Sequence, residues 1–217
     1  MSFFRSLLLK PWNYEGQETS AIAGDMAGLG SAPQQIALVI FLSVVTVLFS
    51  LFGVAYFMRM AVDTSSPLFC GAGYWEVLNE PKILWLNTGI LIFTSGVIEW
   101  TRREAGLGRG GLVKLGLVFG AVLTLAFLYG QSVAWRELNQ SGYMVNSNAA
   151  TSFFYLLTGL HALHVIGGLW VWFSTTATAF FDETDPVRLS STIKLCAIYW
   201  HFLLILWVLL FVLFLNT

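Results

Sequence analysis

Five long apolar segments separated by short polar connections dominate the hydrophobic pattern of this 217-residue chain. The segments cover residues 36–60, 83–100, 115–135, 152–180 and 193–215. Each reaches the length of about 17 to 25 residues that an α-helix needs to cross a hydrocarbon core of about 30 Å. All five prolines fall outside the segments, as expected for continuous helices. The pattern predicts an all-α polytopic membrane protein with five transmembrane helices.

The composition agrees with this fold class. Hydrophobic residues make up 57% of the chain and charged residues 11%, whereas soluble domains carry about 25% charged residues. A net charge of −1 provides no basic field for phosphates, so we expect no nucleic-acid partner. We expect a cytoplasmic or interfacial tail at residues 1–35, with a short interfacial helix near its start, and one membrane domain at residues 36–217.

Basic residues are unevenly divided between the two sides of the predicted membrane. If the N-terminus is inside, the inner segments carry Arg5, Lys10, Arg102, Arg103, Arg109, Lys114, Arg188 and Lys194, and the outer ones carry Arg59, Lys82 and Arg136. Because cytoplasmic loops are enriched in lysine and arginine, we predict the N-terminus inside and the C-terminus outside. Cys70 and Cys196 differ too much in expected depth to predict a disulfide.

All three histidines lie in apolar segments. Since an unpaired polar group in hydrocarbon costs several kcal/mol, His161, His164 and His201 either ligate a metal or haem or form hydrogen bonds that hold helices together. At about 1.5 Å per residue, His201 lies about 10 Å from the inner face, and the other two lie about 14 to 18 Å from the outer face. This difference, and the lack of a carboxylate deep in any span, favour packing histidines, with no metal site.

Glu99 ends the second segment, three and four residues before Arg102 and Arg103. A carboxyl buried in the membrane would be a candidate for proton transfer. However, the predicted interface is only about one helical turn away, and both arginines are within reach on the same helix. We therefore favour an interfacial ion pair over a proton-relay role.

Small and polar residues predict close helix contacts. Gly116 and Gly120 form a small-xxx-small pair, and the fourth segment has further small residues at Gly159, Ala162, Gly167 and Gly168. In the second segment, Asn87, Thr94 and Ser95 share roughly one helix face, typical of hydrogen bonding to a neighbouring helix or to lipid headgroups. Trp200 is expected to pack against another helix, while Trp85, Trp100 and Trp135 lie near predicted interfaces.

Four stretches of the chain carry a resemblance to a known family. They are SFFYLLTGLHALHVIGG at residues 152–168, YWHF at 199–202 followed by Trp207, WLNTGILIFTSG at 85–96 and FLSVVTVLFSLFGVAYFMR at 41–59. The first resembles the T-G-x-H-G-x-H-V-x-x-G motif of subunit III of the haem-copper respiratory oxidases. The others are similar to the corresponding helices of the shorter, five-helix bacterial members.

This resemblance implies an accessory subunit of a cytochrome c or quinol oxidase in a bacterial cytoplasmic (inner) membrane. The chain itself would hold no redox centre and no catalytic residue. Haem and copper would belong to partner subunits, chiefly subunit I, and the chain would bind phospholipid. The residues expected in packing or in a lipid cleft are Trp85, Asn87, Thr158, Gly159, His161, His164, Gly167, Tyr199, Trp200 and His201.

The chain departs from the family pattern at three positions. Val45 and Leu204 stand where members commonly carry acidic residues, and Ala162 stands where a glycine is usual. These changes count against a role in proton uptake inside this subunit. They do not count against lipid binding or a structural role. Two other functions remain open: an accessory protein of a nitric oxide reductase, and an intrinsic haem b protein that uses His161 or His164 with His201.

Overall fold

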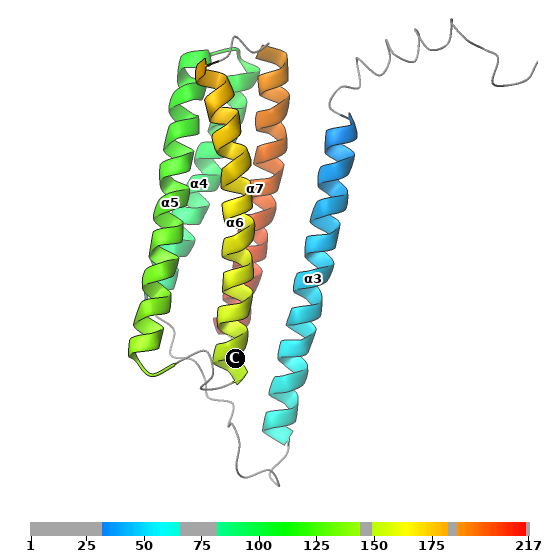
Figure 1. The fold of residues 1–217 in the computed structure, drawn as a ribbon, viewed down its shortest axis with the longest axis vertical. Coiled ribbons are helices and arrows are strands. Elements are labelled where there is room, and N and C mark those ends of the chain that lie inside the picture. Colours follow the sequence, from blue (N-terminus) through cyan, green and yellow to red (C-terminus); the bar gives the residue numbers. More distant parts are fainter. Residues whose placement is uncertain (1–31, 66–81, 144–148, 182–185, 216–217) are drawn as a thin grey trace, which may run out of the picture. The chain divides into compact units, whose positions relative to one another are not determined.

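The computed structural model describes residues 32–65, 82–143, 149–181 and 186–215. These residues form five α-helices (Figure 1): α3 (Ala32–Ser65), α4 (Ile83–Gly106), α5 (Gly110–Gln140), α6 (Ala149–Phe181) and α7 (Pro186–Leu215). Each predicted segment lies inside one helix, and each helix is long and apolar enough to cross a membrane. The expected five-helix, all-α fold is therefore confirmed. The proposed interfacial helix near the N-terminus lies outside the described residues.

Helix ends extend beyond the predicted spans. Pro33 lies in the first turn of α3 and Pro186 is the first residue of α7. Proline is tolerated there because the first backbone N–H groups of a helix have no partner within the helix. Between α4 and α5 the glycine-rich turn is short, and Gly108 adopts a positive φ of 71°, which only glycine adopts at little cost.

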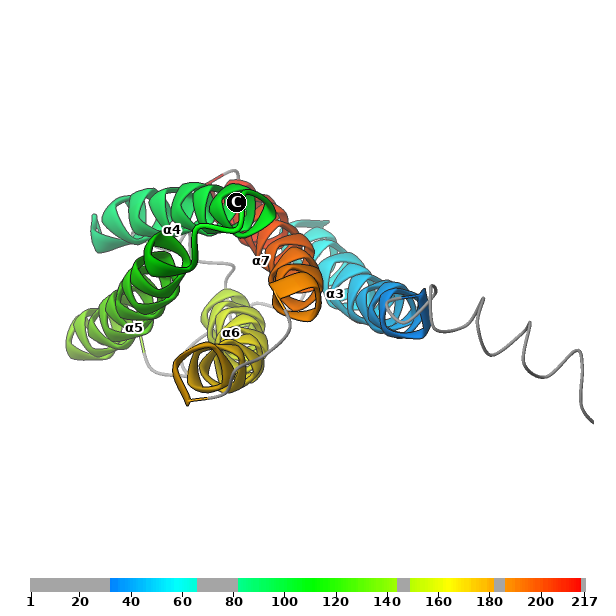
Figure 2. The same cartoon turned by 90° about the horizontal axis from the view of Figure 1, so that it is seen from above.

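Helices α4 to α7 form an antiparallel four-helix bundle. The chain divides into two compact units after Ile40, and the bundle belongs to the second. Helices α4 and α6 each contact both α5 and α7, and the view along the bundle shows this cyclic arrangement (Figure 2). Short connections between consecutive helices explain the up-and-down topology.

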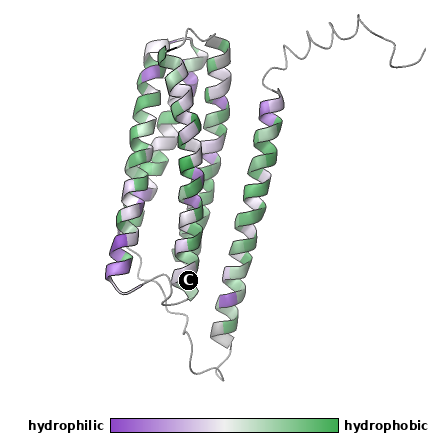
Figure 3. Ribbon diagram, in the orientation of Figure 1, coloured by the Kyte–Doolittle hydropathy of each residue, from purple (hydrophilic) through white to green (hydrophobic). Residues whose placement is uncertain are grey.

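The bundle is apolar both inside and outside. Trp172, Trp207, Phe127 and Phe154 are almost completely buried, whereas Trp170 is 77% exposed. Hydrophobic residues cover most of each helix, and hydrophilic residues gather at places such as the C-terminal end of α5 (Figure 3). A helix that is hydrophobic all round is typical of a membrane span.

Glycines allow the helices of the bundle to approach closely. Gly116 faces Thr101 of α4, Gly120 faces Trp172 of α6, and Gly130 faces Asn87. At each of these positions an added Cβ would come within 3.2 Å of the facing side chain. The predicted small-xxx-small contact at Gly116 and Gly120 is confirmed.

On α6 the expected small-residue contacts are present in part. Ala162 is buried and Gly168 faces the Tyr199 ring. By contrast, a Cβ added at Gly159 or Gly167 would meet nothing within 4 Å among the described residues. The two glycines are eight residues apart, so they share a helix face, and this face is not the one that α5 and α7 cover.

Replacing Gly130 by alanine tests whether close α4–α5 approach stabilises the bundle. The added methyl group would overlap the Asn87 side chain, and such overpacking costs about 1 to 3 kcal/mol. Gly130→Ala should therefore lower the midpoint of thermal unfolding. Gly89→Ala on exposed α4 surface is the matched control, and it should be neutral or stabilising by up to about 1 kcal/mol. Equal effects of the two substitutions would contradict the packing interpretation.

Candidate functional site

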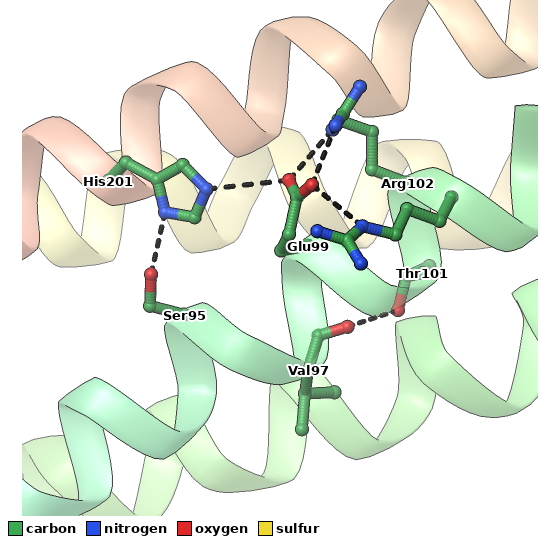
Figure 4. Close-up of polar contacts among 7 residues, drawn as sticks. Ser95, Val97, Glu99, Thr101, Arg102 and His201 are labelled. Atoms are coloured by element: carbon green, nitrogen blue, oxygen red, sulfur yellow. Dashed lines mark hydrogen bonds and ion pairs between the residues drawn. The ribbon is translucent and has the colours of Figure 1, made fainter.

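Glu99 is the centre of a polar cluster on α4 and α7 (Figure 4). Arg102 donates to both carboxylate oxygens, from Nε at 2.7 Å and from Nη2 at 2.6 Å. Arg103 Nε donates to Oε1 at 3.1 Å. These are contacts at i+3 and i+4, which place side chains on the same helix face, and a bidentate arginine–carboxylate pair is a strong one. The arginines expected to pair with Glu99 are thus its partners.

His201 brings α7 to this cluster. Its Nε2 lies 3.6 Å from Glu99 Oε2, and its Nδ1 lies 2.6 Å from Ser95 Oγ. The Glu99 side chain is 25% exposed, while those of Arg102 and Arg103 are 39% and 71% exposed. The cluster therefore links two helices and keeps one cation, Arg103, largely accessible. Its location at the membrane interface stays a prediction.

The link from His201 to α4 was missed by sequence reasoning because Ser95 and His201 are 106 residues apart in the chain. The stripe of Asn87, Thr94 and Ser95 was the available signal. All three side chains are buried. Thr94 bonds the Ile90 carbonyl of its own helix, whereas Asn87 and Ser95 bond other helices.

His164 is satisfied by its own helix. Its Nδ1 lies 2.7 Å from the Leu160 carbonyl oxygen, so this nitrogen carries the proton because a carbonyl can only accept. The backbone carbonyl of His164 accepts a hydrogen bond of 2.8 Å from the Tyr199 hydroxyl. Phe41 and Phe49 of α3 contact the imidazole ring, at 6.2 and 5.7 Å between centroids. His164 therefore bonds within its own helix and lies against two aromatic rings of α3.

His161 packs in a different way from the one expected. It is completely buried, and its ring lies 6.0 Å from Phe127 and 5.0 Å from Trp207 between centroids. Neither ring nitrogen has a hydrogen-bond partner among the described residues. Packing of this histidine is present, but the hydrogen bond that we expected to a neighbouring helix is not found in the described part of the chain.

Tryptophan N–H groups form hydrogen bonds between helices. Trp135 donates to Thr158 Oγ1 at 3.1 Å, Trp172 to the Leu117 carbonyl at 2.8 Å and Trp207 to Thr88 Oγ1 at 3.0 Å. Each of these bonds joins two helices and fixes the height of one helix against the other. Thr158, a predicted packing residue, is thereby joined to α5.

The other predicted tryptophans differ in burial. Trp200 is 2% exposed and lies edge-on to Trp172 of α6 at 6.3 Å. Trp85 is 60% exposed and contacts Phe211 of α7 at 4.9 Å between centroids. Trp85 therefore lies on the outer surface of the bundle.

The histidines do not converge on a metal site within the described ranges. No group of three or more His, Cys, Asp or Glu side chains that could hold a metal ion is found among those residues. His201 uses both ring nitrogens in contacts with Ser95 and Glu99, and His164 uses Nδ1 in its own helix. Cys196 is a free, buried thiol, and Cys70 lies outside the described residues.

The two positions that lack the acid of the family pattern are apolar and packed. Val45 on α3 is 4% exposed, and Leu204 on α7 packs against the buried core. Val45 and Leu204 are apolar side chains in contact with the hydrophobic core.

Fold and site define a multi-pass, all-α membrane protein whose polar side chains bond either within their own helix or to a neighbouring helix. A family model described as "Cytochrome c oxidase subunit III" matches residues 3–216, nearly the whole chain. The chain belongs to the cytochrome c oxidase subunit III family.

Individual relatives carry the same description. A "Probable cytochrome c oxidase subunit 3" of Mycobacterium tuberculosis is 36% identical over 90 residues, which cover 42% of this chain and 44% of that protein. The match therefore spans less than half of the mycobacterial relative's length. The "Cytochrome c oxidase subunit 3" of Corynebacterium diphtheriae is 28% identical over 210 residues, 89% of this chain and 97% of that protein. That of Arabidopsis thaliana is 26% identical over 167 residues, 75% and 62% respectively.

Removing the charge of Glu99 tests how strongly the cluster joins α4 to α7. Glu99→Gln should lower the unfolding midpoint only slightly, by the equivalent of less than about 1 kcal/mol, because partly exposed ion pairs are screened. Glu137→Gln, on an exposed position of α5, is the control and should leave the midpoint unchanged. The difference between the two variants should shrink at high salt. A large, salt-insensitive loss for Glu99→Gln would contradict a screened ion pair.

Proposed function

We propose that this chain is an accessory subunit III, without a redox centre, of a proton-pumping haem-copper terminal oxidase in aerobic respiration. The family match across residues 3–216 is the observation that carries the proposal. The relatives named cytochrome c oxidase subunit 3 support it, including one that aligns over 97% of its own length. Oxygen reduction would take place in a partner subunit that carries haem and copper.

The contribution of this chain is structural. His164 and His201 hold contacts within and between helices, and His161 packs against aromatic rings. None of these contacts calls for an electron-transfer role. A rigid bundle of four helices, with α3 in addition, would instead offer apolar surface to subunit I and to lipid. Residues such as Leu51 and Val54 of α3 and Trp170 of α6 are more than half exposed and would take part in these contacts.

Phospholipid binding belongs to the same proposal. Arg102 and Arg103 use some of their N–H groups on Glu99 and remain 39% and 71% exposed. Guanidinium groups bind phosphate through paired hydrogen bonds, so a lipid headgroup is the expected ligand. By the charge asymmetry of the sequence, this end of α4 would face the cytoplasm, with the N-terminus inside and the C-terminus outside a bacterial inner membrane.

Purification through a tag on this chain tests the proposed partner. In a mild detergent, the full chain should bring with it a large haem-copper subunit, and the preparation should consume oxygen. Recovery of the chain alone under conditions that preserve other respiratory complexes would contradict the proposal. A co-purified large subunit that consumes nitric oxide instead of oxygen would replace the oxidase with a nitric oxide reductase.

The visible spectrum of the separated chain tests whether the histidines bind haem. We expect no Soret band, because the His201 nitrogens are already in contact with Ser95 and Glu99. His161→Leu should weaken retention of the partner or of lipid before it changes the haem spectrum of the complex. A Soret band of the separated chain that is lost in His161→Leu would instead indicate an intrinsic haem b protein.

A further inference from the structure

Three buried polar side chains from three different helices lie at one level of the bundle. Asn87 of α4 donates from Nδ2 to Gln131 Oε1 of α5, at 3.4 Å. On α6, Thr158 accepts a hydrogen bond from Trp135 of α5. His161 is three residues after Thr158, and the His161 ring contacts Phe127 of α5. Helix α5 runs antiparallel to α6, and Gln131 lies midway between Phe127 and Trp135, four residues from each. Gln131 is therefore at about the same height in the bundle as His161.

Helix α7 encloses this level through Trp207. The indole ring contacts both His161 and Phe127, at 5.0 and 5.2 Å between centroids, and donates from Nε1 to Thr88 Oγ1 next to Asn87. The exposed fractions of Asn87, Gln131 and His161 are 0%, 1% and 0%. All four helices of the bundle therefore surround one polar layer, which we define as Asn87, Gln131 and His161.

The hydrogen-bonding capacity of the polar layer is only partly used. Asn87 Oδ1, Gln131 Nε2 and both ring nitrogens of His161 have no partner among the described residues. Exchanging the oxygen and nitrogen of both amides would reverse their bond and still leave one acceptor and one donor unused. A neutral imidazole adds one further donor and one further acceptor. Polar groups buried as deeply as these normally have partners, from protein or from ordered water.

We propose that the polar layer is an internal water-binding site, in which at least one ordered water molecule bridges His161 to the Asn87–Gln131 pair. Water can donate two hydrogen bonds and accept two, which matches the mixed donors and acceptors of the layer. The layer consists of two amides and an imidazole and contains no carboxylate, so a divalent cation is a poorer match. The site joins α4, α5 and α6 and holds their register.

A cryo-electron microscopy map of the complex purified through the tagged full chain tests the site directly. We expect density within hydrogen-bond distance of a His161 ring nitrogen and of the Asn87 or Gln131 amide. A map that resolves ordered water elsewhere in the complex but shows none here would overturn the proposal. Direct contact between the imidazole and the Gln131 amide, with no density between them, would do the same.

Solid-state NMR gives a second test that does not depend on which partner is recovered. The chain has three histidines, so ¹⁵N-histidine labelling of the full chain in phospholipid gives three rings, and the His161 signals are assigned by their loss in His161→Phe. Magnetisation should pass from bound water to the His161 nitrogens, and this transfer should be lost in Gln131→Leu. Absence of transfer in the unmodified chain, or unchanged transfer in Gln131→Leu, would overturn the shared site.

Thr124→Val is the matched control for the NMR measurement. Thr124 is as buried as Gln131 and lies seven residues away on α5, but its hydroxyl already donates to the Gly120 carbonyl at 2.9 Å. Its removal should leave the transfer to His161 unchanged. Loss of transfer in this variant would show that any buried substitution on α5 abolishes the signal, which contradicts a site that depends on Gln131.

Discussion

The need to satisfy hydrogen-bonding groups in a medium without water is the constraint on which the rest of this structure depends. In hydrocarbon an unpaired backbone N–H or C=O costs several kcal/mol, so a spanning segment must be helical. Hydroxyl groups follow the same rule locally. Thr88, Thr94, Thr101 and Thr124 each donate to the carbonyl oxygen four residues earlier. These side chains can therefore lie in apolar helices without a partner from another helix.

Association of the helices has to come from other sources, because apolar side chains gain little by leaving lipid for protein. In this bundle, glycines such as Gly116 and Gly130 bring backbones close together, and indole N–H groups supply directed bonds between helices. Close approach and directed bonds have the same consequence. They fix the heights of α4 to α7 relative to one another and so decide which polar groups meet.

The two polar clusters of the bundle differ in charge and in exposure. The Glu99 cluster is partly exposed, and Arg102 and Arg103 donate to the Glu99 carboxylate. His201 of the neighbouring helix α7 lies 3.6 Å from the same carboxylate. The Asn87–Gln131–His161 layer is uncharged in composition and completely enclosed. Paired charge where the side chains are partly exposed, and neutral polarity where they are fully enclosed, is the difference expected from the cost of burying ions in hydrocarbon.

The sequence by itself determined the five helices, the membrane class and the family, because hydrophobic segment length and the T-G-x-H motif are local properties of the chain. It also placed Glu99 with its arginines, since i+3 and i+4 neighbours follow from helix geometry. Only the tertiary structure decided that Ser95 meets His201, that Gln131 shares a level with His161, and that Gly159 and Gly167 lie on a face outside the α5 and α7 contacts. Those outcomes depend on the rotation and relative height of the helices, which are set by packing between residues far apart in the chain.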